Sequence, residues 1–229
     1  MGKLGDFLSG TQILEKAESS INGRIIVEKS LAWGTYISAS GLTQSGGIIN
    51  DIWKKPLKRI SNFSSRGRSA SGGQFPISNV LILGLGGGTV AKLVKKYWPE
   101  VKITGVDIDP MMVELGKKYL ELDKTGIEIV IEDAFKYVEK QSKFKSKNKF
   151  DLVLVDLYIG DNYPVKFESE NYIQLVRSVL ANGGVTVFNR LYYGEKRPEA
   201  MKFCEKLGKV FKKVDIVFPE VNVMFLCTK

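Results

Sequence analysis

The chain has 229 residues, of which 44% are hydrophobic, and it carries a net charge of +9 without a single histidine. The lack of histidine excludes a Ser-His-Asp or Cys-His mechanism and a histidine-ligated metal, so acid–base chemistry falls to Asp, Glu, Tyr or Lys. Cys204 and Cys227 have no metal-binding or disulfide spacing, and we expect buried free thiols in a cytoplasmic protein. No apolar run has membrane-spanning length, and residues 1–10 lack the apolar core of a signal peptide.

Basic residues cluster in three stretches, at 54–59, 143–149 and 209–213. Such a surface could attract nucleic acid, or it could be a solvated lysine-rich exterior. No aromatic-interleaved RNA-binding motif accompanies the charge, which favours the solvated exterior.

Residues 1–60 are expected to form a small β-hairpin region with a connecting helix. Short β-rich segments separated by turn residues predict the hairpins, while residues 13–18 fit either a strand or a short helix. Helical spacing of apolar residues extends over 48–60, and Pro56 within it predicts a break or kink. Residues 61–76 are rich in Ser, Gly and Arg, which predicts a flexible linker that is either a mobile lid or disordered.

The remaining residues, 77–229, alternate between strand and helix patterns, which predicts a mostly parallel α/β sheet with helices on both faces. The last two strands are too close for a helix between them and predict an antiparallel hairpin at one edge. This Rossmann-like arrangement resembles class I S-adenosylmethionine-dependent methyltransferases rather than most nicotinamide dehydrogenases. The predicted strands span 79–84, 101–107, 127–131, 150–156, 184–190, 210–217 and 221–228. The predicted helices span 89–98, 110–122, 133–142, 168–180 and 195–208.

A glycine-rich turn follows the first of these strands. Residues 80–83 form the apolar run of a strand buried on both faces, and a helical pattern begins at Thr89. Strand, glycine turn and helix bring the backbone close to a nucleotide, so Gly84, Gly86 and Gly88 are predicted to bind one. Thr89 replaces the third glycine of G-x-G-x-x-G, and a plain tight turn is the alternative.

Acidic residues follow the next strands, at the edge where ligands of open α/β sheets bind. Asp107 lies about twenty residues past the glycine turn, where a carboxylate accepts hydrogen bonds from ribose hydroxyls. Asp109 is instead predicted to cap the helix that follows it. Asp133 either accepts a hydrogen bond from an adenine amino group or caps the next helix, and Ile108 or Phe135 is expected to pack on the ring.

The loop that opens at Asp156 combines acids with aromatic side chains, a mixture that suits a cationic amine. Asp156 is predicted to orient a nucleophile or to take its proton, with Asp161 and Tyr158 lining the acceptor pocket. The alternative is that Asp156 caps a turn and that Asp161 is solvated.

These motifs together resemble the spermidine synthase (polyamine aminopropyltransferase) family and its methyltransferase-like relatives over most of the chain. The resemblance implies a transferase that uses S-adenosylmethionine or its decarboxylated form, binds no metal, and acts as a homodimer on a small-molecule amine. The segment that ends at Gln44 loosely matches the family's Leu-Asp-Gly-x-x-Gln, which implies that Gln44 contacts the nucleoside. The Asp133-Ala134 pair matches the adenine side of the family's site, and Asp156 with Asp161 matches its catalytic acids.

One position departs from the aminopropyltransferase pattern. The family's turn resembles Gly-Gly-Gly-Asp-Gly-Gly, in which the acid holds the amine of the aminopropyl group, and Gly87 stands at that position here. The resemblance therefore favours the divergent, methyltransferase-like branch and methyl transfer to an amine or another nucleophile. Aminopropyl transfer to putrescine is the alternative, and a non-catalytic nucleoside- or RNA-binding protein is the alternative of another class.

Overall fold

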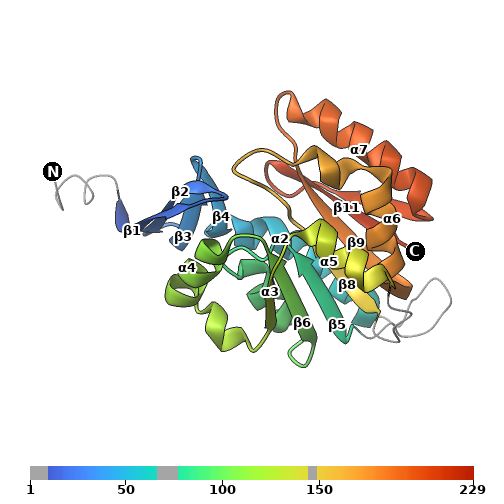
Figure 1. Cartoon of the computed structure of the whole chain (residues 1–229), viewed down its shortest axis with the longest axis horizontal. Coiled ribbons are helices and arrows are strands. Elements are labelled where there is room, and N and C mark those ends of the chain that lie inside the picture. Colours follow the sequence, from blue (N-terminus) through green and yellow to red (C-terminus); the bar gives the residue numbers. More distant parts are fainter. Residues whose placement is uncertain (1–9, 66–76, 144–148) are drawn as a thin grey trace.

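The structure is a computed structural model that describes residues 10–65, 77–143 and 149–229. It consists of a small antiparallel sheet and a larger α/β unit (Figure 1). Residues 13–18, whose sequence fits either a strand or a helix, lie in the first strand of the small sheet. This sheet has the order β1-β2-β3-β4 and contains β1 (Thr11–Ser19), β2 (Gly23–Ser30), β3 (Gly34–Ala39) and β4 (Leu42–Gly46).

The larger sheet has seven strands in the order β10-β11-β9-β8-β5-β6-β7. The strands from β9 to β7 in this order run parallel, and the β10–β11 hairpin runs antiparallel beside β9. The predicted α/β fold, mostly parallel with an antiparallel hairpin at one edge, is therefore confirmed. The strands are β5 (Asn79–Leu83), β6 (Lys102–Asp107), β7 (Glu128–Ile131), β8 (Phe150–Val155), β9 (Leu180–Leu191), β10 (Lys213–Val217) and β11 (Asn222–Thr228).

Helices cover both faces of the larger sheet (Figure 1). Leu81 and Leu83 of β5 belong to the core under α5, α6 and α7, whereas Val80 and Ile82 belong to the core under α2 and α3. Alternate side chains of one strand thus fill two cores, which requires the continuous apolar run seen in the sequence. The helices are α2 (Ile49–Ser65), α3 (Thr89–Tyr97), α4 (Pro110–Leu120), α5 (Ala134–Lys143), α6 (Glu170–Val179) and α7 (Lys196–Val210), with short 3-10 turns η1 (Leu122–Thr125) and η2 (Val165–Glu168).

Helix α2 is more regular than the sequence predicts. It continues through Pro56, so of the break or kink predicted there, the break is wrong. Residues 61–65 of the predicted linker are helical. A proline cannot donate its intrahelical hydrogen bond, but Trp53 and Leu57 are fully buried on the same helix, and their burial offsets that loss. Residues 66–76, which carry the rest of the linker prediction, lie outside the described residues.

Two element boundaries also differ from the prediction. β9 begins at Leu180, directly after α6, and a register shift between Leu180 and Val185 takes up the intervening glycines. Helix α7 continues to Val210, so β10 begins later, at Lys213. Neither difference moves the carboxyl ends of the parallel strands.

The small sheet packs on α4 through a core of its own. Ile25, Val27 and Ile37 contribute from the sheet, and Met112 and Leu115 contribute from α4. Figure 1 shows the sheet above α4, to one side of the larger unit. This packing sets the small sheet beside the strand ends that line the main cavity.

Candidate functional site

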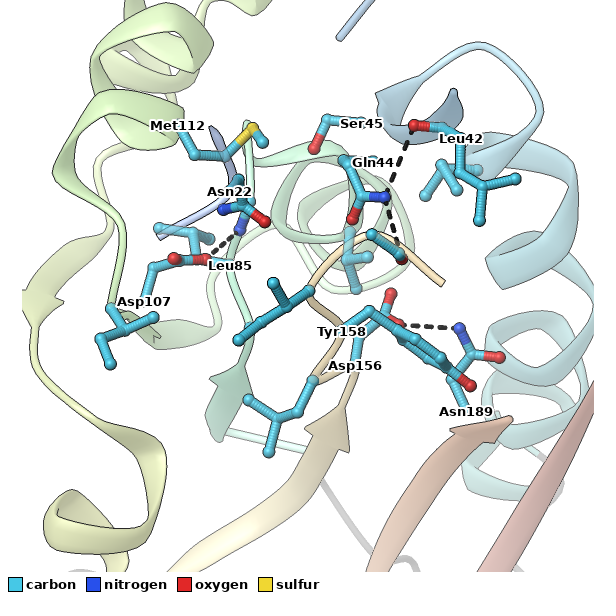
Figure 2. A pocket seen from close by; sticks show the side chains of 18 of the residues that line it. Asn22, Leu42, Gln44, Ser45, Leu85, Asp107, Met112, Asp156, Tyr158 and Asn189 are labelled. Carbon is cyan, nitrogen blue, oxygen red and sulfur yellow. Dashed lines mark hydrogen bonds between the residues drawn. The ribbon is translucent and has the colours of Figure 1, made fainter. Parts of the chain in front are cut away.

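A cavity of about 420 Å³ lies between the small sheet and the carboxyl ends of β5, β6 and β8 (Figure 2). Ligands of open α/β sheets bind at this edge. Two predicted site residues, Gly88 and Asp161, do not line the cavity. Those that do are Gln44, Gly84, Gly86, Asp107, Ile108, Asp133, Ala134, Asp156 and Tyr158.

Two glycines of the turn have left-handed backbone and allow close packing against neighbouring segments at the cavity wall. Gly84 has φ +88° and Gly86 has φ +55°. A Cβ at Gly84 would overlap the carbonyl oxygen of Asp156, and one at Gly86 would lie 2.7 Å from Ser45 Oγ. Gly88 instead begins α3, and a Cβ there would overlap Leu122, so its role is packing.

Hydroxyl groups on both sides hold the glycine turn to the small sheet. The Gly87 N–H donates to Ser45 Oγ at 2.6 Å, and the Gly46 N–H donates to Thr89 Oγ1 at 2.6 Å. Thr89 therefore replaces the third glycine of the motif with a buried hydrogen-bond acceptor. A Cβ at Gly87 would lie 2.9 Å from Leu120 Cδ1, so position 87 faces the packing between the sheets rather than the cavity.

Asp107 is fixed at the end of β6 by two backbone hydrogen bonds. Oδ2 accepts from the Gly86 N–H at 2.6 Å, and Oδ1 accepts from the Asp109 N–H at 2.9 Å. Burial raises the pKa of the Asp107 carboxyl, although the backbone donors oppose this. Each carboxylate oxygen retains a second lone pair for a hydroxyl donor. Ile108 lies beside it with 42% of its surface exposed.

Asp133 caps α5, which is one of the two roles left open for it. Its Oδ1 accepts from the N–H groups of Phe135 and Lys136 at 2.9 and 3.1 Å. Its Oδ2 pairs with Lys166 Nζ at 2.5 Å. Burial is the largest single influence and raises the pKa of Asp133, but the hydrogen bond and charge of Lys166 and the two backbone donors together outweigh it, and the pKa is lowered. Phe135 stacks on the core residue Tyr172, so Ile108 is the expected ring-packing residue that faces the cavity.

Asp156 is held at the end of β8 by side chains that the sequence analysis missed. Trp53 Nε1 donates to its Oδ2 at 2.9 Å. Asn189 Nδ2 donates to its Oδ1 at 2.8 Å (Figure 2). Asn222 Nδ2 donates in turn to Asn189 Oδ1 at 2.8 Å. Burial raises the pKa of the Asp156 carboxyl, while the two direct donors lower it.

The missed residues carry weak sequence signals. Trp53 falls on the apolar face of a helix, where an aromatic residue is usually core. Asn189 lies close to the end of the strand after Asp156, and Asn222 begins the last strand. Polar residues at neighbouring strand ends are the one signal that could have found the pair.

Tyr158 separates the main cavity from a second cavity of about 350 Å³, and it lines both. Its hydroxyl accepts from the Leu191 N–H at 2.8 Å, and burial raises its pKa. Asp161 is exposed and lines the second cavity, because the backbones of Ile159 and Asn162 pair to close a tight turn. The structure therefore does not bring Asp161 into the cavity of Asp156.

Gln44 connects the small sheet to the loop that follows β8. Its Nε2 donates to the carbonyl oxygens of Gly160 at 3.3 Å and Leu42 at 3.5 Å (Figure 2). Gln44 thus lines the cavity, and its backbone carbonyl oxygen would lie 3.6 Å from a Cβ at Gly86 of the glycine turn.

Within the described ranges, no group of three His, Cys, Asp or Glu side chains is placed to hold a metal ion. Both cysteines are free thiols, as expected, and Cys227 is buried while Cys204 is partly exposed. No helix in the described part of the chain is long and apolar enough to cross a membrane.

The parallel strands and the glycine turn lie within a segment that matches a known protein family. Residues 74–224 match the spermine/spermidine synthase domain. The chain belongs to this family. It is a family of transferases, and several of its members are named polyamine aminopropyltransferases.

Curated relatives carry two kinds of names. The polyamine aminopropyltransferase of Neisseria meningitidis serogroup A is 30% identical over 132 residues, which cover 57% of this chain and 47% of that protein. The eEF1A lysine and N-terminal methyltransferase homolog of Drosophila melanogaster is 32% identical over 142 residues, which cover 59% of this chain and 21% of that protein. The chain thus spans about half or less of the length of these relatives.

Solved structures share the fold. Spermidine synthase from Thermotoga maritima has a TM-score of 0.73 at 21% identity, over 95% of this chain and 73% of that one. A spermidine synthase in complex with the transition-state analogue AdoDATO has a TM-score of 0.72 at 21% identity, over 95% and 72%. Human methyltransferase-like protein 13 in complex with SAH has a TM-score of 0.60 at 20% identity, over 79% and 80%.

Proposed function

We propose that this family member is an S-adenosylmethionine-dependent methyltransferase and that the main cavity binds the donor. The supporting observation is the group of Gly84, Gly86 and Asp107 at one cavity wall, with backbone exposed and a carboxylate fixed beside it. Asp107 would accept the ribose hydroxyls, and Ile108 would pack on the adenine. Asp133 and Ala134, which also line the cavity, would border the adenine side, and Gln44 would contact the nucleoside.

The residues present suit this donor. Because glycines have no Cβ, a ligand can approach the backbone of the turn closely. The acidic side chains near the turn favour a ligand with a cationic centre. When bound, S-adenosylmethionine supplies an electrophilic methyl group on a sulfonium. Asp156, at the β8 end of the same cavity, would orient the nucleophile and accept its proton. Tyr158 would close the wall on that side and limit water access.

Methyl transfer is proposed ahead of aminopropyl transfer because of position 87. The family resemblance associates aminopropyl binding with an acid there. In this chain Gly87 donates its N–H to Ser45 Oγ, and the space for a side chain is taken by Ile37, Ser45 and Leu120. An amine of the donor would therefore find no carboxylate at this position.

Aminopropyl transfer from decarboxylated S-adenosylmethionine remains the second candidate. Among the residues that the structure describes, four acids line the cavity, namely Asp107, Glu132, Asp133 and Asp156, and one basic residue does, Lys166. An acid-rich cavity favours a donor without a carboxylate and a cationic acceptor such as putrescine. Relatives named polyamine aminopropyltransferase support the same candidate. A homodimer and a small amine acceptor are part of both proposals.

Calorimetric titration with each donor separates these candidates. We expect S-adenosylmethionine to bind more tightly than its decarboxylated form. Asp107→Asn should weaken binding by about 10- to 100-fold, since it removes charge from a hydrogen-bond acceptor. Asp123→Asn changes an exposed acid on η1 and serves as the matched control, with affinity unchanged.

Product analysis completes the test. Formation of spermidine from putrescine and the decarboxylated donor would reject methyl transfer and support aminopropyl transfer as the activity. Binding of neither donor, together with salt-dependent RNA binding, would instead support a non-catalytic nucleic-acid-binding protein.

A further inference from the structure

The Asp156 carboxylate belongs to a relay of side chains from four separate elements. Trp53 comes from α2, Asn189 from β9 and Asn222 from β11, and the relay distances are 2.9, 2.8 and 2.8 Å. Asn189 and Asn222 are each only 4% exposed, and Trp53 is fully buried. All of these side chains except Trp53 line the main cavity.

The chemistry of the groups gives the relay a direction. An ionised carboxylate only accepts, so Asn189 must present Nδ2 to Asp156 and keep Oδ1 for Asn222. Asn222 must then present Nδ2 to Asn189. Its own Oδ1 is left buried and without a hydrogen-bond partner among the described residues.

This last oxygen indicates that the relay serves something other than stability. A buried amide oxygen without a donor destabilises the folded state, whereas apolar side chains of similar size would avoid that loss. A chain that retains such a group at a cavity wall is expected to use it.

Amides are suited to this position because they donate and accept equally well. When Asp156 gains a proton, its carboxyl can donate to Asn189 Oδ1 once that amide turns over. Once the Asn222 amide turns over as well, Asn189 Nδ2 can donate to Asn222 Oδ1, the atom that lacks a donor in the ionised arrangement. The relay thus offers a complete set of bonds to Asp156 in either protonation state.

The described residues that contact Asp156 carry no competing charge. Trp53, Asn189 and Asn222 are neutral, and so are Tyr158 and Tyr163, whose pKa values burial raises. Arg190 acts on the two tyrosines from β9. The other cavity acids, Asp107, Glu132 and Asp133, lie at the ends of β6 and β7.

We propose that Asn189 and Asn222 are positioning residues that hold Asp156 in both its ionised and its protonated form. In the transfer step the nucleophile forms a bond to the donor's methyl carbon, and the carbon–sulfur bond breaks with its electron pair left on the sulfur of the thioether product. The nucleophile's bond to hydrogen breaks, the proton passes to the Asp156 carboxylate, and the two amides reverse. The proton later leaves to solvent and the amides return. This inference rests on the proposed role of Asp156 as the proton acceptor.

Trp53 provides a readout that needs neither donor nor acceptor. Its indole N–H contacts the carboxylate directly, so its fluorescence should change as Asp156 titrates. In a Trp33→Phe, Trp98→Phe background it is the sole tryptophan, because the chain has three. We expect one fluorescence transition with pH that disappears in Asp156→Asn.

The variants then test the relay. Asn189→Leu removes the donor to Asp156 and should shift the transition to higher pH. In Asn222→Asp the new carboxylate can only accept hydrogen bonds, so it competes with Asp156 for Asn189 Nδ2. This variant should also shift the fluorescence transition to higher pH. Asn222→Leu should give a smaller shift of the same sign without adding charge. Asn171→Asp makes the same change on the exposed face of α6 and should give none.

Kinetics add a second readout. Asn189→Leu should lower kcat by about 10- to 100-fold with the KM for donor nearly unchanged, as expected when a hydrogen bond to a charged group is lost. An unchanged fluorescence midpoint in Asn189→Leu and Asn222→Asp would overturn the proposal, as would a transition that persists in Asp156→Asn. The expected shifts in a protein without transfer activity would retain the relay and reject the proposed function.

Discussion

The carboxylate of Asp109, at the start of α4, accepts a 2.6 Å hydrogen bond from the hydroxyl of Ser19, at the end of β1. The same oxygen accepts from Asn22 Nδ2 at 2.7 Å, while the other accepts from the Met111 N–H at 2.9 Å. The capping role predicted for Asp109 is thus confirmed. One buried acid both begins a helix of the larger unit and binds the turn of the small sheet.

Asp109→Ala should therefore destabilise the protein by about 2–4 kcal/mol, the sum of a lost helix cap and two unsatisfied donors. Urea unfolding at neutral pH measures this. Ser19→Ala removes one of these contacts and also the acceptor of the Ile21 and Asn22 N–H groups, so it should cost about 1–2 kcal/mol. A loss in Asp109→Ala no larger than in Ser19→Ala would contradict the added contribution of the cap and of the bond from Asn22.

Gly84→Ala tests the close approach of the glycine turn to β8. The new methyl group would overlap the carbonyl oxygen of Asp156, at a residue whose φ is already +88°. We expect a loss of more than about 3 kcal/mol in urea unfolding. Gly126→Ala is the matched control, with φ +63° and nothing within 4 Å of the new atom, and should cost only about 1 kcal/mol.

Tyr158→Phe tests the wall between the two cavities. The variant leaves the Leu191 N–H without its acceptor at 2.8 Å and should destabilise the protein by about 1–2 kcal/mol. Tyr193→Phe removes a hydroxyl from an exposed ring and should leave the urea midpoint unchanged. Similar midpoints for both variants would mean that the buried hydroxyl does not support the backbone.

The Asp133–Lys166 pair makes stability depend on acid pH. Because the pKa of Asp133 is lowered in the folded state, its contribution is present above the unfolded pKa and is lost as pH falls through the folded pKa. Lys166→Met removes the partner and raises that pKa, so melting temperature should begin to fall at a higher pH than in the wild type.

Scanning calorimetry between about pH 2 and pH 6 measures how the melting temperature falls with pH. Lys136→Met serves as the control, since Lys136 is exposed and contacts Asp133 only through its backbone N–H. The Lys166 effect should be modest, because that side chain is 51% exposed and solvent screens the pair. If both variants showed the same fall of melting temperature at acid pH, the Asp133–Lys166 pair would not be its cause.

The alternation of patterns after residue 77 was enough to predict the sheet and its terminal hairpin. Those elements follow from local periodicity, which a sequence displays directly. The glycine turn and Asp107 were predictable for a similar reason, because parallel strands bring their carboxyl ends to one edge. Pro56 misled the prediction, since its cost is local whereas the burial of Trp53 that offsets it depends on the whole fold.

The parts that escaped prediction depend on contacts between distant residues. Trp53 and Asp156 are 103 positions apart, and Asn189 and Asn222 are 33 apart. No periodicity links such pairs. Asp161 was grouped with Asp156 by closeness in sequence, but the tight turn at Ile159 and Asn162 leaves it at the second cavity. Short separation along a loop does not imply a shared site.

The main cavity takes its walls from Asn22 near one end of the chain and from Asn222 near the other, with residues of both sheets between them. No local opening of a single element can therefore release a bound molecule's contacts without disturbing the rest. A ligand that fills this cavity should slow amide hydrogen exchange in β4 and in β11 together, although those strands belong to different sheets. Occupancy would thereby strengthen the coupling between the two sheets when the protein unfolds.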